Sequence, residues 1–422
     1  MGEFKPLIRN PKFVYVWLSQ ILSQLTISIM NFLLLIRLFA VTGSTIATSL
    51  LWVAYALPAI LIGPFAAASV DLFDKRKMLM ITNLLQSATI FGYALVHETK
   101  FFLLYGVAFA YSLLNQFYVP AEAASIPAVV PKKHLPYANG LFFVTQQGAL
   151  IVGFGVAGVL NHWLGYSNSI FLAAGLLFLA FVSVSFLPEL KEEQEETPRT
   201  FQQAVEHFFE TIVEGYEFIK EQRSILAPFL LLIGLQIASA VVTVNIPVVA
   251  TELLGISPNS AGTLIIVPAG IGAIVGAIFI PKLLRAGARK KKIMEACFMA
   301  LGLLFLLLTF LVPEIPGGLR LLFSTGITIL IGLTFVGLLI PAQTYLQEAT
   351  PGGLRGRVFG NFWFLVTIAT LLPVIFSGAI TELLGIRTLL VIMSGLAIGA
   401  LIFSKRYGQK MIENGFSIRK TI

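Results

Sequence analysis

Apolar stretches long enough to cross a membrane as helices alternate with short polar segments along the whole chain. About 20 apolar residues suffice for one crossing of the hydrocarbon layer. We expect twelve such helices, at 13–40, 45–70, 78–97, 101–126, 139–163, 168–187, 225–253, 259–284, 293–312, 319–348, 358–383 and 387–404. The pattern predicts an all-α membrane protein in which a polar stretch separates the first six helices from the last six.

The polar stretch at 188–224 divides the chain into three predicted parts: a six-helix bundle at 1–187, a linker, and a six-helix bundle at 225–422. Within the linker, apolar residues recur every three or four positions opposite glutamates, which predicts an amphipathic helix. These apolar residues are Phe201, Val205, Phe208, Ile212, Tyr216 and Ile219. The helix either lies along the cytoplasmic face and couples the two bundles or is a solvated linker helix.

Two short segments recur in the second half of the chain. Val119-Pro120-Ala121-Glu122 is matched by Ile340-Pro341-Ala342-Gln343, 221 residues later, and Asn161–Gly165 is matched by Thr381–Gly385 at a spacing of 220. Both matches occur in the same order and at equivalent positions of the helix pattern. They predict two pseudo-symmetric six-helix bundles that arose by duplication, an architecture common among secondary transporters.

Composition narrows the class of protein. Of the 422 residues, 57% are hydrophobic and only 12% are charged, and the mean hydropathy is +0.87, whereas soluble proteins are about 25% charged. These values exclude a secreted enzyme, a disulfide scaffold and a nucleic-acid-binding protein. The single cysteine, Cys297, and four scattered histidines show no metal-ligand spacing, so we expect neither a metal nor a cofactor. An integral-membrane enzyme is the alternative of another class, and the lack of a nucleophile elbow or phosphate loop disfavours it.

The Lys and Arg residues are distributed asymmetrically. If the N-terminus is cytoplasmic, all but four of the 29 lie on predicted inside segments, and the exceptions are Arg37, Lys100, Arg320 and Arg387. Such an excess on one side is the positive-inside rule of membrane proteins. It predicts a multi-pass protein of a prokaryotic cytoplasmic membrane with both termini in the cytoplasm. It also accounts for the net charge of +8 without a nucleic-acid partner.

The segment Gly63–Lys77 resembles the loop signature of the major facilitator superfamily, in which Gly, three residues, Asp-Arg, one residue and Gly precede two basic residues. Asp71, Lys75 and Arg76 match this pattern. Ala67, Leu72 and Asp74 stand where the pattern has Gly, Arg and Gly. The resemblance implies the fold of that superfamily and transport of a small molecule by alternating access.

The resemblance also implies a role for the loop. An acid at the C-terminal end of a helix is unfavourably placed for the helix dipole, so Asp71 needs a partner elsewhere. In the family, this acid faces the start of span eleven and a basic loop residue and forms a cytoplasmic gate. Here we expect the gate to comprise Asp71, Lys75, Arg76, Glu122 and Arg357. The alternative is a solvated charged turn.

A narrower resemblance involves Tyr118–Ala121, Ile126-Pro127, Val130-Pro131, Leu135–Leu141 and Thr42–Ser44. These segments are similar to the branch that holds the enterobactin exporters and macrolide efflux proteins. The resemblance implies a secondary active efflux pump for a small amphipathic or hydrophobic molecule. We expect the protein to be a monomer. Lysophospholipid transporters carry a related pattern, so a lysophospholipid flippase is the alternative.

Arg37 and Glu122 are the only two charged residues that lie more than two positions inside the ends of a predicted span, and we place both in the hydrocarbon region. A charge in the hydrocarbon region costs at least about 2.5 kcal/mol, so each of these residues is a candidate for coupling transport to an ion. The coupling ion that we consider is H⁺. Arg37 is close enough to the outer turn to snorkel, which is its alternative role. Glu122 is either a proton carrier or a member of the gate bound to Lys75 or Arg76. The acid usual in span one of this branch is replaced by Ile27.

The resemblance places spans one, four, seven and ten around the central pathway, and each carries uncharged polar residues at helical spacing. Such residues avoid lipid because they would lack hydrogen-bond partners there. The candidate substrate-binding residues are Gln24, Asn31, Tyr111, Asn115, Gln236, Thr243 and Gln343. Roughly half of such groups would instead hydrogen-bond between helices. With no cation in the middle of the membrane, an amphipathic or weakly charged substrate fits better than a strongly anionic one.

Glycines are concentrated in two of the predicted spans. Gly148, Gly153, Gly155 and Gly158 lie in the fifth, and Gly272 and Gly276 lie in the eighth. Small residues allow helix backbones to approach closely in membranes. We expect close helix packing at both places.

Overall fold

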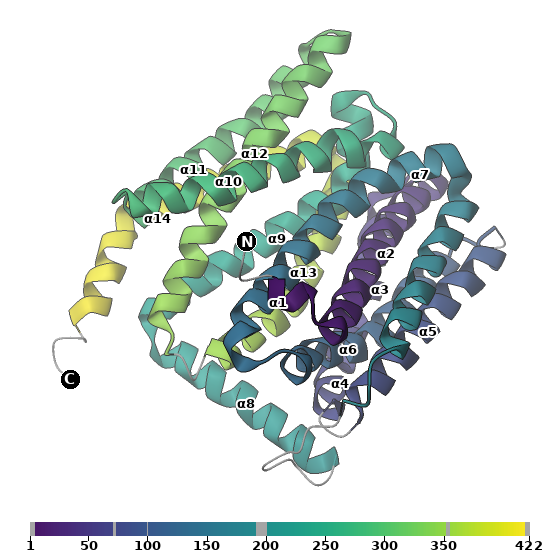
Figure 1. Ribbon diagram of the computed structural model, residues 1–422. Helices are drawn as coiled ribbons and strands as arrows, with labels where there is room; N and C mark the ends of the chain where they lie inside the picture. Colours follow the sequence, from purple (N-terminus) through teal and green to yellow (C-terminus); the bar gives the residue numbers. More distant parts are fainter. Residues whose placement is uncertain (1–4, 71–72, 99, 191–200, 352–354, 418–422) are drawn as a thin grey trace. The chain divides into compact units, whose positions relative to one another are not determined.

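The computed structural model describes residues 5–70, 73–98, 100–190, 201–351 and 355–417. This part of the chain is almost entirely helical and contains no β-strand (Figure 1). It forms two compact units. Unit 1 comprises Met1–Gly43 and Leu50–Glu210, and unit 2 comprises Ser44–Ser49 and Thr211–Ile422. The division between residues 210 and 211 falls within the predicted linker at 188–224.

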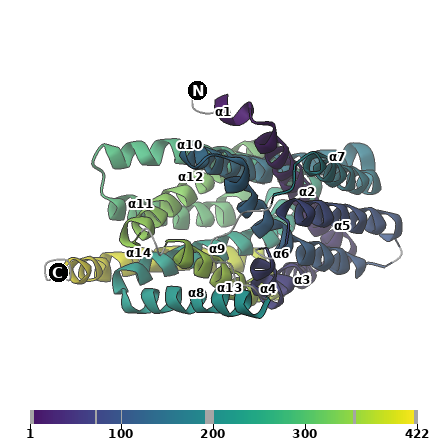
Figure 2. The same ribbon diagram turned by 60° about the horizontal axis from the view of Figure 1, so that its bottom comes forward.

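Unit 1 is built around α2, which packs against α7 and α6, while α5 packs against the same two helices. Figure 2 shows α7 next to α2 and α5. Buried aromatic side chains such as Phe13, Tyr118 and Phe142 fill the space between them. The helices in the first half of the chain are α1 (Lys5–Ile8), α2 (Pro11–Thr42), α3 (Thr45–Leu61), α4 (Gly63–Ser69), α5 (Lys75–Val96), α6 (Leu103–Val129), η1 (Lys132–His134) and α7 (Leu135–Ser185). All of them belong to unit 1 except the start of α3, which belongs to unit 2.

The ends of α2 follow from its sequence. The Asn10 side chain accepts a hydrogen bond from the N–H of Lys12, and Pro11 occupies the first helical turn, where its missing N–H is not needed. Gly43 ends the helix in the left-handed conformation, with φ 63°, and its N–H donates to the carbonyl of Phe39. The helix therefore begins and ends close to the limits expected for the first span.

Two of the predicted spans are joined in α7. The predicted helices at 139–163 and 168–187 meet at Gly165, whose φ of 77° and ψ of 166° interrupt the helical backbone. Only glycine adopts such angles without strain. The predicted span at 45–70 is also bent: α3 and α4 meet at an angle of 49°. Glycine and proline at residues 63 and 64 begin α4 there.

Unit 2 has α9 packed against α12 and α13, α10 packed against α12, and α11 packed against α12 and α14. Its core includes Ile225, Phe229, Leu346, Val358 and Phe362. The elements of this half are α9 (Arg223–Val248), η2 (Val249–Leu254), η3 (Pro258–Ser260), η4 (Gly262–Ile266), α10 (Val267–Arg285), α11 (Lys290–Leu306), η5 (Leu307–Leu311), η6 (Val312–Glu314), α12 (Gly317–Ala349), α13 (Arg355–Leu384) and α14 (Ile386–Ser417).

The amphipathic helix expected in the linker is α8 (Phe201–Glu221). Its second half belongs to unit 2, where Ile219 is buried in the core. The Nδ2 atom of Asn361 in α13 donates to the main-chain oxygen of Ile212 at 2.8 Å. This part of α8 therefore contacts its own unit, and the two roles expected for the helix stay predictions.

Helix crossings at glycine are confirmed at three of the expected positions. A Cβ atom on Gly153 would lie 2.5 Å from the Cβ of Ser28, so α7 approaches α2 closely there. Gly272 of α10 faces the carbonyl of Ile329 in α12, and Gly276 lies against the same helix. The expectation is wrong for Gly148, because among the described residues no atom beyond the neighbouring backbone of its own helix lies within 4 Å of a Cβ position.

In the described ranges, nine helices are long and apolar enough to cross a membrane, or ten when the bent pair α3 and α4 is counted as one span. The predicted total of twelve is compatible with this result. One of the nine, α7, contains two predicted spans. Helix α6, which carries Tyr, Ser, Asn, Gln and Glu side chains, is not among the nine.

Candidate functional site

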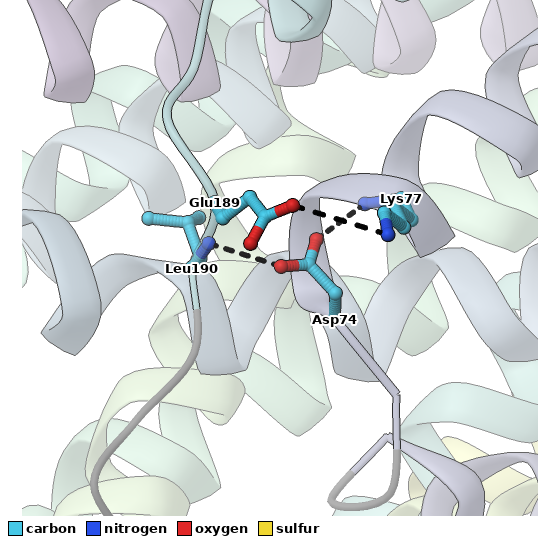
Figure 3. Close-up of polar contacts among 4 residues, drawn as sticks. All are labelled: Asp74, Lys77, Glu189 and Leu190. Carbon is cyan, nitrogen blue, oxygen red and sulfur yellow. Dashed lines mark hydrogen bonds and ion pairs between the residues drawn. The ribbon is translucent and has the colours of Figure 1, made fainter.

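Asp74 stands directly before α5, and its carboxylate accepts two main-chain hydrogen bonds (Figure 3). Oδ1 accepts from the N–H of Lys77 at 2.8 Å, and Oδ2 accepts from the N–H of Leu190 at 3.2 Å. The Nζ atom of Lys77 lies 4.0 Å from Oε1 of Glu189, and both side chains are largely exposed. An acidic cap of this kind stabilises a helix N-terminus by about 1 kcal/mol. The loop between α4 and α5 is thereby fastened to the residues that follow α7.

The other basic residues of the loop are also engaged within unit 1. Lys75 is buried, and the Nη2 atom of Arg76 donates to the main-chain oxygen of Ser185 at 2.6 Å. Asp71 lies outside the described residues, and Arg357 belongs to α13 in a stretch whose side chains are not described. The cytoplasmic gate that we expect to include Asp71 and Arg357 therefore stays a prediction.

A connected group of polar side chains is buried between α2, α5 and α6. The Tyr118 hydroxyl donates to Oε1 of Glu122 at 2.8 Å and lies 3.4 Å from the Ser19 hydroxyl. The Nδ2 atom of Asn83 donates to that same hydroxyl at 3.0 Å. Glu122 is 8% exposed, and in the described part of unit 1 no basic side chain pairs with it. The structure thus brings Glu122 together with Tyr118 rather than with Lys75 or Arg76.

Several polar atoms near this group lack partners. Oδ1 of Asn83 and both polar side-chain atoms of Gln86, one turn further along α5, are buried without a hydrogen-bond partner among the described residues. Each such atom costs about 1–3 kcal/mol. The burial of these three atoms therefore lowers the stability of unit 1.

The candidate substrate-binding residues differ in exposure. In unit 1, Gln24, Asn31 and Asn115 are half-buried, whereas Tyr111 is fully buried. In unit 2, the candidate residues Gln236, Thr243 and Gln343 are also half-buried. Thr243 donates its hydroxyl hydrogen to the carbonyl of Ser239 at 2.8 Å. The structure places all seven on α2, α6, α9 and α12, and their role in binding stays a prediction.

One polar residue of the first span serves helix packing instead. The Nε2 atom of Gln20 donates to the main-chain oxygen of Phe142 at 2.8 Å, and its Oε1 accepts from the Thr145 hydroxyl at 2.7 Å. Both contacts join α2 to α7. Gln20 is thus an example of the interhelical hydrogen bonding that we expect for part of the polar stripes.

Arg37 is associated with aromatic residues of unit 1. Its Cζ atom lies 5.2 Å from the centroid of the Tyr166 ring, and the Tyr166 hydroxyl lies 2.8 Å from that of Tyr93. The His97 ring is 5.2 Å from the same ring. A guanidinium over a tyrosine face is attracted by the ring quadrupole. The contact fixes where Arg37 lies and leaves both of its predicted roles open.

Unit 2 contains a carboxylate that caps the start of α3. Oε2 of Glu382 in α13 accepts from the Ser44 hydroxyl at 2.5 Å and from the N–H of Ile46 at 3.1 Å. The Thr45 hydroxyl donates to the carbonyl of Gly378 at 2.7 Å. The segment Ser44–Ser49 is therefore tightly held within this unit.

A cavity of about 310 Å³ in unit 2 is lined by Leu254, Gly255, Ile256, Gly317, Arg320 and Leu321. Arg320 donates from Nε to the carbonyl of Ile315 at 3.0 Å and from Nη2 to that of Pro313 at 2.9 Å. These bonds hold the turn before α12. The guanidinium therefore has a structural role at this place.

Comparison with known proteins decides the family. The model of the Major Facilitator Superfamily matches residues 16–372, which is most of the chain. The chain belongs to the major facilitator superfamily. The resemblance noted in the loop after α4 is thereby confirmed, and the protein is a multi-pass membrane transporter rather than an enzyme.

Relatives of this transporter include efflux pumps. It is 26% identical over 398 residues to the uncharacterized MFS-type transporter YfiS of Bacillus subtilis, with 90% of each chain covered. It is 25% identical to the multidrug efflux pump Tap of Mycolicibacterium fortuitum, covering 83% of this chain and 85% of Tap. It is also 25% identical to macrolide efflux protein A of Streptococcus pyogenes, covering 53% of this chain and 54% of the relative.

Solved structures support the fold of this transporter. A single-residue mutant of the nucleoside transporter NupG matches with a TM-score of 0.72 at 14% identity, covering 92% of this chain and 98% of that chain. The POT family transporter PepTSo matches with a TM-score of 0.70 at 13% identity, covering 96% and 99%. These matches confirm the predicted fold class.

Sequence reasoning missed two residues of this transporter that the structure singles out. Asp74 is a departure from the family pattern, but an Asp directly before a helix is also a typical N-cap, and that signal was available. In the sequence, Glu382 is singled out only as a member of the repeated segment Thr381–Gly385. Its hydrogen bonds to the start of α3 join distant parts of the chain and leave no local signal in the sequence.

Proposed function

We propose that this transporter exports a small amphipathic or hydrophobic molecule by secondary active transport with alternating access. The observation that carries the proposal is the likeness to the multidrug efflux pump Tap along 83% of the chain. The candidate substrate-binding residues are uncharged, which suits an amphipathic or weakly charged substrate. We further propose that the end of the protein bearing residues 71–77 faces the cytoplasm, on the basis of the positive-inside rule.

Glu122 is the proposed carrier of a coupling proton. A carboxylate that is buried without a basic partner is far more costly when ionised than when neutral. Glu122 is buried, and its hydrogen-bond partner is the Tyr118 hydroxyl. The chain Asn83, Ser19, Tyr118 and Glu122 provides hydroxyl and amide groups that can reorient as a proton arrives or leaves. The alternative role in the gate has less support, because Arg76 donates to Ser185.

Transport by the purified protein in liposomes tests both the proposed export of an amphipathic molecule and the proposed role of Glu122 as proton carrier. With an imposed pH gradient, we expect wild-type protein to move a lipophilic cationic dye or a macrolide against its concentration gradient. Glu122→Gln should lower the gradient-driven rate at least tenfold, because the amide cannot bind and release a proton. Glu122→Asp should retain part of the rate.

Glu98→Gln is the matched control, since this glutamate side chain is 84% exposed at the end of α5. We expect it to leave the gradient-driven rate unchanged. An undiminished response of Glu122→Gln to the pH gradient would exclude Glu122 as the carrier. Movement of labelled lysophospholipid, with none of the dye or macrolide, would replace the efflux proposal by the flippase.

A further inference from the structure

The end of α10 and the start of α11 carry an unusually dense group of cations. Six of the eleven residues from Lys282 to Lys292 are Lys or Arg. Two of them have acidic partners: Lys290 pairs with Glu348, and Lys291 lies 3.7 Å from Glu295. The other four are exposed, and across the described ranges none of them contacts an acidic side chain. These four are Lys282, Arg285, Arg289 and Lys292.

In the basic loop between α4 and α5 of unit 1, by contrast, the cations Lys75, Arg76 and Lys77 are buried or have partners within the protein. There Lys75 is buried, Arg76 is bound to the carbonyl of Ser185, and Lys77 lies beside Glu189. These cations serve contacts within the protein. Membrane topology accounts for cations at both places, but it requires no particular alignment of them with the helix surface.

Such an alignment exists on α10. Ile271, Val275, Ile278, Lys282 and Arg285 follow one another at steps of four, three, four and three, so they form one stripe along the helix. The three apolar members are 47%, 45% and 57% exposed. The opposite face of α10, with the buried Gly272 and Gly276, packs against α12. The stripe therefore lies on the exposed face of α10. It is apolar from Ile271 to Ile278 and cationic at Lys282 and Arg285.

The dimensions of the stripe match one leaflet of a bilayer. The 14 residue-to-residue steps from Ile271 to Arg285 rise about 21 Å along the helix axis. Half of the hydrocarbon layer is about 15 Å thick. The apolar part thus lies at the depth of the acyl chains when Lys282 and Arg285 lie at the depth of the headgroups.

We propose that this face of α10 binds an anionic phospholipid, with an acyl chain along Ile271, Val275 and Ile278 and the phosphate at Lys282 and Arg285. A guanidinium binds phosphate oxygens in a forked geometry, and cations without acidic partners near the membrane surface attract anionic lipids. Arg285 donates from Nε to the carbonyl of Pro281 at 3.4 Å, which leaves its Nη1 and Nη2 groups for a phosphate. A zwitterionic lipid is less suitable because its own ammonium group opposes the cations. The site is independent of the transported substrate and of the direction of transport.

Native mass spectrometry of the purified full-length protein tests this site. The protein is titrated with dioleoyl phosphatidylglycerol or with dioleoyl phosphatidylcholine, which have the same acyl chains. We expect phosphatidylglycerol adducts at a concentration at least fivefold lower than phosphatidylcholine adducts. Lys282→Gln combined with Arg285→Gln should abolish this preference, and Ile278→Ser should weaken the binding of both lipids.

Lys132→Gln combined with Lys133→Gln is the matched control, because it also removes two exposed cations but lies in η1 of unit 1. We expect this variant to keep the preference. Equal binding of the two lipids by wild-type protein would overturn the proposal. So would an equal loss in the two double variants, which would indicate a general effect of net charge. Thermal midpoints in phosphatidylcholine alone show whether each variant is folded.

Discussion

The carboxylate of Asp74 shows why a departure from a family pattern can be stabilising. The pattern has glycine at this position, yet the backbone of Asp74 has φ −61° and ψ 119°, which any residue adopts. In this protein, the side chain at position 74 contributes a hydrogen-bond acceptor. Its two oxygens satisfy the N–H groups of Lys77 and Leu190, which belong to different parts of unit 1.

Replacement of Asp74 by alanine removes both hydrogen bonds. We expect Asp74→Ala to lower the stability of unit 1 by about 1 kcal/mol or more, in line with the loss of a helix cap. Asp74→Asn keeps an acceptor and should lose less. The thermal midpoint in detergent measures the difference. Glu189→Gln serves as the control, because an exposed ion pair contributes at most about 1 kcal/mol. Equal midpoints for Asp74→Ala and wild type would contradict the capping role.

At the scale of elements, α10 and α12 meet at a reciprocal pair of glycines. Gly272 faces the carbonyl of Ile329, and Gly332 faces the carbonyl of Ala269. A Cβ atom at either position would collide with main-chain atoms, which cannot rotate away. The clustering of Gly272 and Gly276 predicts a crossing, but the identity of the partner depends on which helices become neighbours.

Gly272→Ala should therefore force α10 and α12 apart. Overpacking of this kind costs about 1–3 kcal/mol. Gly395→Ala in α14 is the control, since nothing lies within 4 Å of its Cβ position and alanine favours a helix. We expect a lower thermal midpoint for the first variant and an unchanged or higher one for the second. A midpoint of Gly272→Ala equal to that of wild type would show that the crossing is looser than described.

For the whole molecule, membrane orientation decides how every loop is interpreted. We propose that Lys133 lies on the cytoplasmic side and Glu98 outside. In a Cys297→Ser background, a membrane-impermeant maleimide added to intact cells should label Glu98→Cys at once. Lys133→Cys should react only after the membrane is opened. The reverse order of labelling would invert the proposed topology, because consecutive loops of a spanning protein alternate between the two sides.

Much of the fold could be predicted because it depends on patterns that extend over many residues. Apolar stretches gave the helices, and the segment Gly63–Lys77 gave the family. The contacts of the loop could not be predicted in the same way. Arg76 and Ser185 are 109 positions apart, and the atom of Ser185 that accepts the hydrogen bond is its main-chain oxygen. Asp74 and Leu190 are 116 positions apart, and the group of Leu190 that donates is its main-chain N–H. Every residue has such atoms, so the sequence does not mark which one is used.

The segment Ser44–Ser49 belongs to unit 2, while the residues on either side of it belong to unit 1. The polypeptide therefore passes between the units three times rather than once. A gene cut within the linker would encode a first fragment that carries these six residues and a second fragment that carries Glu382. Neither fragment would be complete by itself, because each would lack hydrogen-bond partners that the other holds. We therefore expect the hydrogen bonds of Ser44 and Ile46 to Glu382 to form only when the two fragments assemble.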